Sequence, residues 1–173
     1  PVPGKSMVGI EVPNQTTGTV TLRSTIESNS FQKVRARSKL ALALGKAAGG
    51  ESVAADLAKM PHLLIAGATG SGKTVCLNAI IACLLMHNTP DDLRLLLIDP
   101  KRVEMTVFNE IPHLLAPVVV ETDQAVVALR RVLVEMDSRF KKLALVKARN
   151  IEAYNHNPKV VTPLPYLVVV IDE

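Results

Sequence analysis

The sequence predicts an α/β fold with a mostly parallel sheet flanked by helices. Short apolar runs with little polar interruption are typical of strands that are covered on both faces, and helical patterns lie between these runs. Strand and helix therefore alternate, as they do in parallel βαβ units. Apolar residues make up 48% of the chain but aromatic residues only 3%, so the core must be aliphatic. The runs are HLLIAG (62–67), LRLLLID (93–99), PVVVE (117–121) and YLVVVID (166–172).

The chain ahead of these runs has a different composition. Residues 1–38 are rich in Pro, Ser, Thr, Asn and Gly, and the apolar alternation at 7–12 and 19–24 predicts small strands separated by turns. We interpret 1–38 as the end of a small preceding domain and a linker, and 39–173 as the main domain. Within the latter, LALAL and SVAADL predict two strands joined by a turn at Gly49 and Gly50.

The net charge of +4 is unevenly distributed. Residues 1–61 contain eight Lys and Arg against four Asp and Glu, whereas residues 62–173 contain twelve of each. The segment KVRARSK (33–39) concentrates the excess. Such a cluster can hold a phosphate backbone, and it can equally be the solvated edge of a strand that resists aggregation.

Helical patterns are predicted at 73–86, at about 100–109 and at 123–148. In the last of these, Thr122 is the expected N-cap and Asp123 lies in the first turn. An apolar seam with spacings of three and four is expected to pack on the sheet, because it is too short for a coiled coil. The opposite face is basic, and it is either solvated or in contact with DNA. The seam consists of Val126, Leu129, Leu133, Met136, Phe140 and Leu143, and the basic face of Arg130, Arg131, Arg139, Lys141, Lys142, Lys147 and Arg149.

The segment GATGSGKT (67–74) fits the phosphate-loop pattern G-x-x-x-x-G-K-[ST] at every fixed position. Glycine lets a strand turn sharply into a helix while its backbone N–H groups approach a phosphate. The helix start adds unpaired N–H groups and a positive dipole end. Lys73 can then reach the terminal phosphates of ATP, and the Thr74 hydroxyl can bind Mg²⁺. The predicted nucleotide-binding residues are Gly67, Ala68, Thr69, Gly70, Ser71, Gly72, Lys73, Thr74 and Val75.

A second acidic element closes the run at 166–172. A buried parallel strand delivers the residue that follows it to the carboxyl edge of the sheet, where phosphates bind. Asp172 is therefore predicted to hold Mg²⁺, and Glu173 to polarise an attacking water. Lys73, Asp172 and Glu173 form the predicted catalytic set.

Two apolar runs separate the loop from this carboxylate strand, which indicates a RecA-like strand order. Asp99 ends the first of them, in IDPKRVE, and is expected to cap a helix with Pro100 in its first turn. A subunit contact by Asp99 or Lys101 is the alternative.

The chain resembles the motor region of the FtsK/SpoIIIE DNA translocases over nearly its whole length. The resemblance lies in PGKSMVGIEVPN, LALALGKAAGGESVAADLAKMPHLLIAGATGSGKTV, LLIDPKRVEMTVFNEIPHLL, RRVLVEMDSRFKKLALVKARNIEAYN and LPYLVVVIDE. It implies a RecA-like P-loop NTPase core, truncated after the Walker B strand that ends at Asp172. Residues 39–173 would then be the N-terminal part of the ATPase motor domain.

The resemblance also implies an ATPase that forms a hexameric ring around double-stranded DNA and moves it during chromosome segregation at cell division. The parent protein would lie at the cytoplasmic face of the bacterial inner membrane, through membrane helices that this chain lacks. The chain itself, with no apolar run of about 18 residues, is expected to be soluble and to hydrolyse ATP weakly or not at all. The alternatives are a related motor that moves polypeptide in secretion, a small-molecule kinase, and a module that binds nucleotide without turnover.

Overall fold

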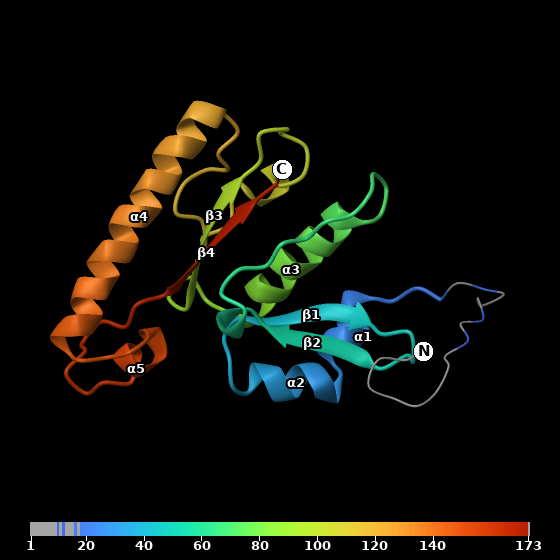
Figure 1. Ribbon diagram of the computed structural model, residues 1–173, viewed down its shortest axis with the longest axis horizontal. Helices are drawn as coiled ribbons and strands as arrows, with labels where there is room; N and C mark the ends of the chain where they lie inside the picture. The colour runs from blue at the N-terminus through green and yellow to red at the C-terminus, as the bar shows by residue number, and fades with distance from the viewer. Residues whose placement is uncertain (1–9, 11, 13–15, 17, 173) are drawn as a thin grey trace.

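The computed structural model describes residues 10, 12, 16 and 18–172. It has the predicted α/β character, with helices on both faces of a parallel pair of strands (Figure 1). No helix among these residues is both long and apolar enough to span a bilayer. The elements are α1 (Leu22–Ile26), α2 (Asn29–Arg35), β1 (Ala41–Lys46), β2 (Ser52–Asp56), the 3-10 helix η1 (Leu57–Lys59), α3 (Lys73–His87), β3 (Leu93–Ile98), the 3-10 helix η2 (Thr106–Phe108), α4 (Thr122–Leu145), α5 (Ile151–Asn155) and β4 (Tyr166–Ile171).

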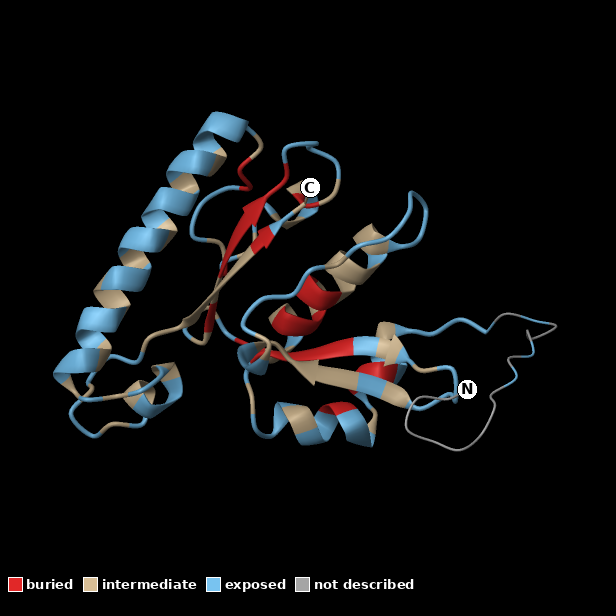
Figure 2. Ribbon diagram, viewed as in Figure 1, coloured by how far each residue is buried: buried red, intermediate tan, exposed pale blue. Residues whose placement is uncertain are grey.

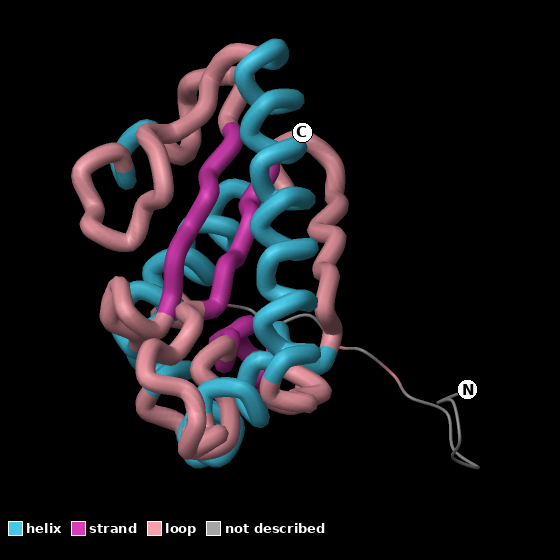
Figure 3. The backbone as a smooth tube through the Cα atoms, turned by 90° about the vertical axis from the view of Figure 1, so that its left-hand side faces the viewer, coloured by secondary structure: helices cyan, strands magenta, loops and turns pink. Residues whose placement is uncertain are grey.

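The parallel pair β3 and β4 is the centre of the fold, and its register runs from Leu93 beside Tyr166 to Ile98 beside Ile171. Successive side chains of β3 point to opposite faces. Leu93, Leu95 and Leu97 join the core cluster that includes α3, whereas Leu96 and Ile98 pack toward α4. The turned view shows α4 running alongside the two strands (Figure 3). Burial on both faces explains why β3 is apolar at every position except Arg94.

The predicted strands at 40–44 and 52–57 are confirmed as the antiparallel hairpin β1–β2. Its register shifts between Ala43 and Gly45, and Gly45 takes a φ of 119°, which glycine adopts without strain. Helix α3 packs on β1, because Leu42 shares a core cluster with Ile81 and Leu84. The hairpin thus supports the helix that follows the glycine loop.

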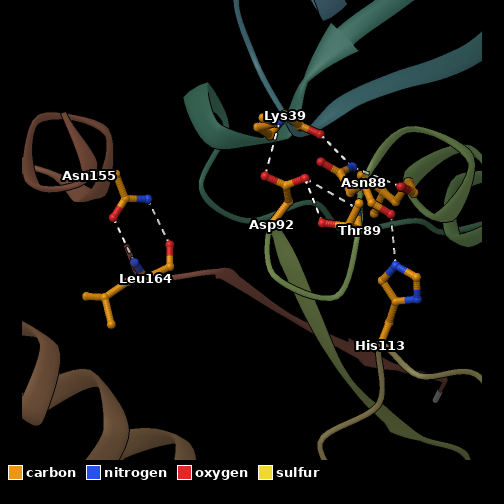
Figure 4. Close-up of polar contacts among 8 residues, drawn as sticks. Lys39, Asn88, Thr89, Asp92, His113, Asn155 and Leu164 are labelled. Carbon is orange, nitrogen blue, oxygen red and sulfur yellow. Dashed lines mark hydrogen bonds and ion pairs between the residues drawn. The ribbon is translucent and has the colours of Figure 1, made fainter. Parts of the chain in front are cut away.

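Polar contacts tie the end of α3 to the starts of β1 and β3 (Figure 4). The Asn88 side-chain amide donates to the carbonyls of Lys39 at 2.9 Å and Leu84 at 2.8 Å. Lys39 Nζ lies 3.1 Å from the Asp92 carboxylate, and His113 Nε2 pairs with the Asn88 carbonyl at 2.8 Å. These contacts fix the C-terminal end of α3 against the starts of β1 and β3.

Two of the predicted strands are wrong. Residues 62–67 belong to no helix or strand and pair with no strand in the described part of the chain, and Leu64 is 90% exposed. Residues 117–121 contribute only an isolated bridge between Val119 and Ile98. A strand needs a hydrogen-bonded neighbour. Residues 62–67 and β4 instead line the same open hollow of about 1770 Å³, so these two segments do not pair.

The predicted strand at 19–24 is also wrong, because this segment leads into α1. Thr21 accepts a hydrogen bond from the Ser24 N–H, and Ser28 accepts one from the Phe31 N–H, so two hydroxyls cap two short helices. Residues 33–39 accordingly lie at the end of α2 and in the turn after it, and not on a strand edge. The strand predicted at 7–12 falls largely outside the described residues, and the division of the chain at residue 38 stays a prediction.

The helix predicted at about 100–109 is reduced to η2. Asp99 does not cap a helix with Pro100 in its first turn. Its carboxylate instead accepts the N–H groups of Glu104 and Met105, and Arg102 takes a φ of 60°, which interrupts any regular helix. The carboxylate thus satisfies backbone groups in a loop conformation that competes with the helix.

Helix α4 ends at Leu145, about three residues before the predicted end, and has Asp123 in its first turn, but its N-cap is Glu121 and not Thr122. The seam expected to pack on the sheet is mostly exposed (Figure 2), and Phe140 is 62% accessible. The contacts are made one position away, by Ala125, Ala128 and Val132. Small side chains let the helix lie close to Leu96 and Ile98. On the basic face, Arg139 pairs with Glu135 and Lys141 with Asp137.

Candidate functional site

The loop at 67–72 adopts backbone conformations that favour glycine. Gly70 has a φ of 78° and Gly72 a φ of 92°, both in the left-handed region. A Cβ on Gly67 would meet the Ser71 hydroxyl, so the Ser71 side chain would have to rotate to make room for it. The sequence pattern therefore corresponds to a curved loop that ends at Gly72, the N-cap of α3.

Several backbone N–H groups of this loop and of the first turn of α3 are unused as donors. Ser71 donates its N–H to Ala68, and the first regular helical bond runs from Cys76 to Gly72. Within the described part of the chain, the N–H groups of Gly70, Gly72, Lys73 and Thr74 meet no acceptor. Free N–H groups at a helix start, together with the positive end of its dipole, attract an anion.

Lys73 is the first residue of α3, and its side chain folds back over the loop. Its Nζ atom donates to the Gly67 carbonyl at 2.6 Å and to the Ala68 carbonyl at 3.2 Å. The ammonium group therefore lies beside the same loop as the free N–H groups. This arrangement concentrates positive charge where a phosphate would enter.

Thr74 connects the loop to the parallel sheet. Its hydroxyl donates to Glu104 Oε1 at 2.9 Å, although the two residues are 30 positions apart. Glu104 in turn donates its backbone N–H to Asp99 Oδ2 at 2.9 Å. Asp99 follows β3 directly and is fully buried. Burial raises the pKa of Asp99, but the N–H groups of Met105, Glu104, Arg102 and Val103 outweigh it and hold the pKa below its usual range.

Asp172 lies at the same edge. Its N–H donates to the carbonyl of Ile98, the residue before Asp99, at 3.0 Å. A continuous series of contacts thus runs from Thr74 through Glu104, Asp99 and Ile98 to Asp172. Lys73 and Asp172 also line the same open hollow.

Each predicted site residue in the described chain has a clear position. Gly67, Ala68, Thr69, Gly70 and Ser71 form the loop, Gly72 caps α3, and Lys73, Thr74 and Val75 occupy its first turn. The Val75 side chain is exposed. Asp172 follows β4, whereas Glu173 lies outside the described residues.

Sequence reasoning missed Glu104. It stands in the block DPKRVE, where only Asp99 and Lys101 drew attention, and no fixed spacing connects it to Thr74. The one available signal was its place in the loop after a buried parallel strand, since such loops gather at the carboxyl edge of the sheet.

Comparison with known proteins identifies the family. The model of the FtsK/SpoIIIE family matches residues 21–173. The chain belongs to this family. Curated relatives named DNA translocase FtsK are 50% identical in Clostridium tetani and 52% in Clostridium acetobutylicum, over 100% of this chain and 23% of each relative. The chain thus spans about a quarter of the length of these FtsK proteins.

Solved structures show the same fold. The conjugation coupling protein TcpA of pCW3, described as a monomer with ATPγS, has a TM-score of 0.67 at 30% identity, over 81% of this chain and 37% of TcpA. The cytoplasmic domain of the type VII secretion ATPase EccC of Thermomonospora curvata has a TM-score of 0.71 at 24% identity, over 91% and 21%. The fold is that of a P-loop ATPase domain with a RecA-like core, as the sequence predicted.

Proposed function

We propose that this chain is part of an ATP-driven motor that moves double-stranded DNA, and that residues 67–75 and Asp172 form its nucleotide site. The observation that carries the proposal is the series of contacts from Thr74 to Asp172. It brings the start of α3 and the end of β4 to one edge of the sheet, where a nucleotide would lie between them.

The loop fits a nucleotide phosphate group. The free N–H groups of Gly70, Gly72, Lys73 and Thr74 would donate to phosphate oxygens, and the Lys73 ammonium would neutralise charge on the terminal phosphates. Val75, in the first helical turn, completes the proposed binding set.

The donor set at the edge also fits Mg²⁺, which prefers oxygen ligands and keeps several waters. The Thr74 hydroxyl oxygen would be one ligand, and Asp172 would act through the metal's water shell. Bound Mg²⁺ supplies charge neutralisation for phosphoryl transfer. Glu173, as the base that orients the attacking water, remains a proposal from its place in the sequence.

Relatives named DNA translocase favour DNA over polypeptide as the substrate. Those relatives are about 50% identical over the whole chain, whereas the secretion ATPase EccC, at 24%, supports the fold alone. We extend the proposal to a homohexameric ring at the cytoplasmic face of the bacterial inner membrane, acting in chromosome segregation. Residues 1–38 would end a smaller domain ahead of the motor.

ATP hydrolysis by the full-length gene product, measured with and without duplex DNA, tests this proposal. We expect DNA to stimulate turnover and Lys73→Ala to lower it by about 100-fold or more, because the variant loses the cation that neutralises charge on the terminal phosphates. Turnover that ignores DNA would contradict the translocase function. Nucleotide binding without any turnover would instead favour a binding module.

A further inference from the structure

The contact between Thr74 and Glu104 assigns Glu104 a role that the phosphate-loop pattern does not include. A hydroxyl group has one proton and two lone pairs. When the Thr74 proton is directed at Glu104 Oε1, 2.9 Å away, the rotation of the hydroxyl is fixed and its lone pairs point elsewhere. A hydroxyl oxygen that binds a cation needs this orientation.

The loop that carries Glu104 is held in place from both sides. Asp99 Oδ2 accepts the N–H groups of Glu104 at 2.9 Å and Met105 at 3.0 Å. The Met105 side chain is fully buried in the core cluster with Leu97. Farther out, Arg102 pairs with Glu121. The Glu104 backbone is thus fixed to β3, and its partly buried side chain reaches α3 from a rigid base.

We propose that Glu104 is a positioning residue for Mg²⁺ binding at Thr74. Its carboxylate accepts the hydroxyl proton and so orients the Thr74 oxygen toward the cation. This inference rests on the proposed nucleotide site. Groups that orient a metal ligand from behind raise its basicity, and their loss commonly costs 10- to 100-fold in metal affinity.

The arrangement also links the nucleotide site to the sheet edge. Glu104 binds Thr74 through its side chain and Asp99 through its backbone. A shift of the Thr74 hydroxyl on cation binding would therefore be transmitted to the loop after β3. Other acidic residues in this region do not share this geometry: Glu110 is exposed and Glu121 pairs with Arg102.

The test is nucleotide binding by the full-length protein, followed with a fluorescent ATP analogue in EDTA and across a Mg²⁺ titration. For Glu104→Ala we expect affinity in EDTA to stay within about twofold of wild type, since the loop amides and Lys73 are intact. In the same variant, the Mg²⁺ concentration at which the enhancement of nucleotide binding is half-maximal should rise about tenfold or more. Glu104→Gln keeps the shape of the side chain but not its charge, so its half-maximal Mg²⁺ concentration should lie between those of wild type and Glu104→Ala.

Controls separate the possible failures. Glu110→Ala removes an exposed carboxylate six positions along the chain and should leave the Mg²⁺ titration unchanged. In a Thr74→Ala background, Glu104→Gln should have no further effect, because the hydroxyl it orients is gone. If Glu104→Ala does not fold, the Mg²⁺ titration of Glu104→Gln tests the proposal in its place.

Equal weakening with and without Mg²⁺, or an unchanged Mg²⁺ titration in both Glu104 variants, would overturn the assignment of Glu104. A wild-type protein that binds no nucleotide would instead overturn the proposed site itself. The two failures are therefore distinguishable.

Discussion

Helices α3 and α4 offer a direct comparison, because both are predicted to within about three residues and differ in what they bury. Helix α3 is 15 residues long and buries Ile80, Ile81, Cys83 and Leu84. Helix α4, with 24 residues, has no buried residue, although it is the more amphipathic of the two. An apolar pattern therefore shows what a helix is able to bury. Whether the apolar face of a helix is in fact buried depends on whether the rest of the chain supplies a surface that packs against it.

The same comparison extends to the helix starts. Helix α3 begins at a glycine in the left-handed region and is tied to β3 through Thr74, Glu104 and Asp99. Neither helix has a side-chain cap at its start, and the N-cap of α4, Glu121, pairs instead with Arg102. The proposed chemistry is associated with the helix whose first turn is tied to the sheet edge, as precise positioning of a phosphate requires.

The largest expected effect is on the buried helix. Leu84→Ala should lower the free energy of unfolding by about 2 to 5 kcal/mol, because it leaves a cavity in the cluster shared with Leu42 and Leu93. Chemical denaturation followed by circular dichroism measures the change. A loss below about 1 kcal/mol would mean that α3 is not the core helix.

Asp99→Asn tests the tie between α3 and β3. The Asn oxygen can still accept the two N–H groups, but the charge that strengthens both hydrogen bonds is lost, which should cost about 2 kcal/mol at neutral pH. Because the folded pKa of Asp99 is lowered, its contribution is complete above the unfolded pKa of about 3.9 and is lost as pH falls through the folded pKa. The stability difference between wild type and variant should thus be flat from pH 5 to 7 and shrink below pH 4. A difference that grows in acid would contradict this assignment.

Gly72→Ala addresses the start of α3. A Cβ there meets open space, so the cost is that of a left-handed φ, roughly 1 to 2 kcal/mol. We expect thermal unfolding to show that loss of stability. A separate binding measurement should show weaker nucleotide binding. Gly18→Ala is a matched control, since its site is also open and its φ is not in the left-handed region; equal losses in both variants would rule out backbone strain.

Leu133→Ala in α4 should have the smallest effect. The side chain is 59% exposed, so this chain should lose no more than about 0.5 kcal/mol. The experiment is the same denaturation series as for Leu84→Ala. A loss as large as that of Leu84→Ala would show that the apolar seam of α4 is covered in solution, and the contrast between the helices would disappear.

The sequence was informative where periodicity and burial agree. The aliphatic runs of β3 and β4 and the pattern of α3 were predicted because these segments are covered or half-covered on the faces that the pattern indicates. Residues 62–67 have the same composition but no strand beside them, so composition alone could not place them.

Local polar groups account for most other errors. The hydroxyls of Thr21 and Ser28 start helices where alternation of apolar residues indicated a strand, and a closer reading of N-cap residues could have found them. The Asp99 carboxylate replaces the expected helix with a loop. That loop carries Glu104, and no sequence spacing could have paired it with Thr74. The glycine loop itself was predictable, since its residues serve local backbone geometry.

The central claim is that the loop at 67–74 and Asp172 form one phosphate and Mg²⁺ site. An experimental structure of the full-length protein with ATPγS and Mg²⁺ tests it most directly. We predict phosphate oxygens against the N–H groups of Gly70 to Thr74, with Thr74 and Asp172 on the side of the cation. Phosphates bound elsewhere, or Asp172 turned away from the metal and its water shell, would contradict the account.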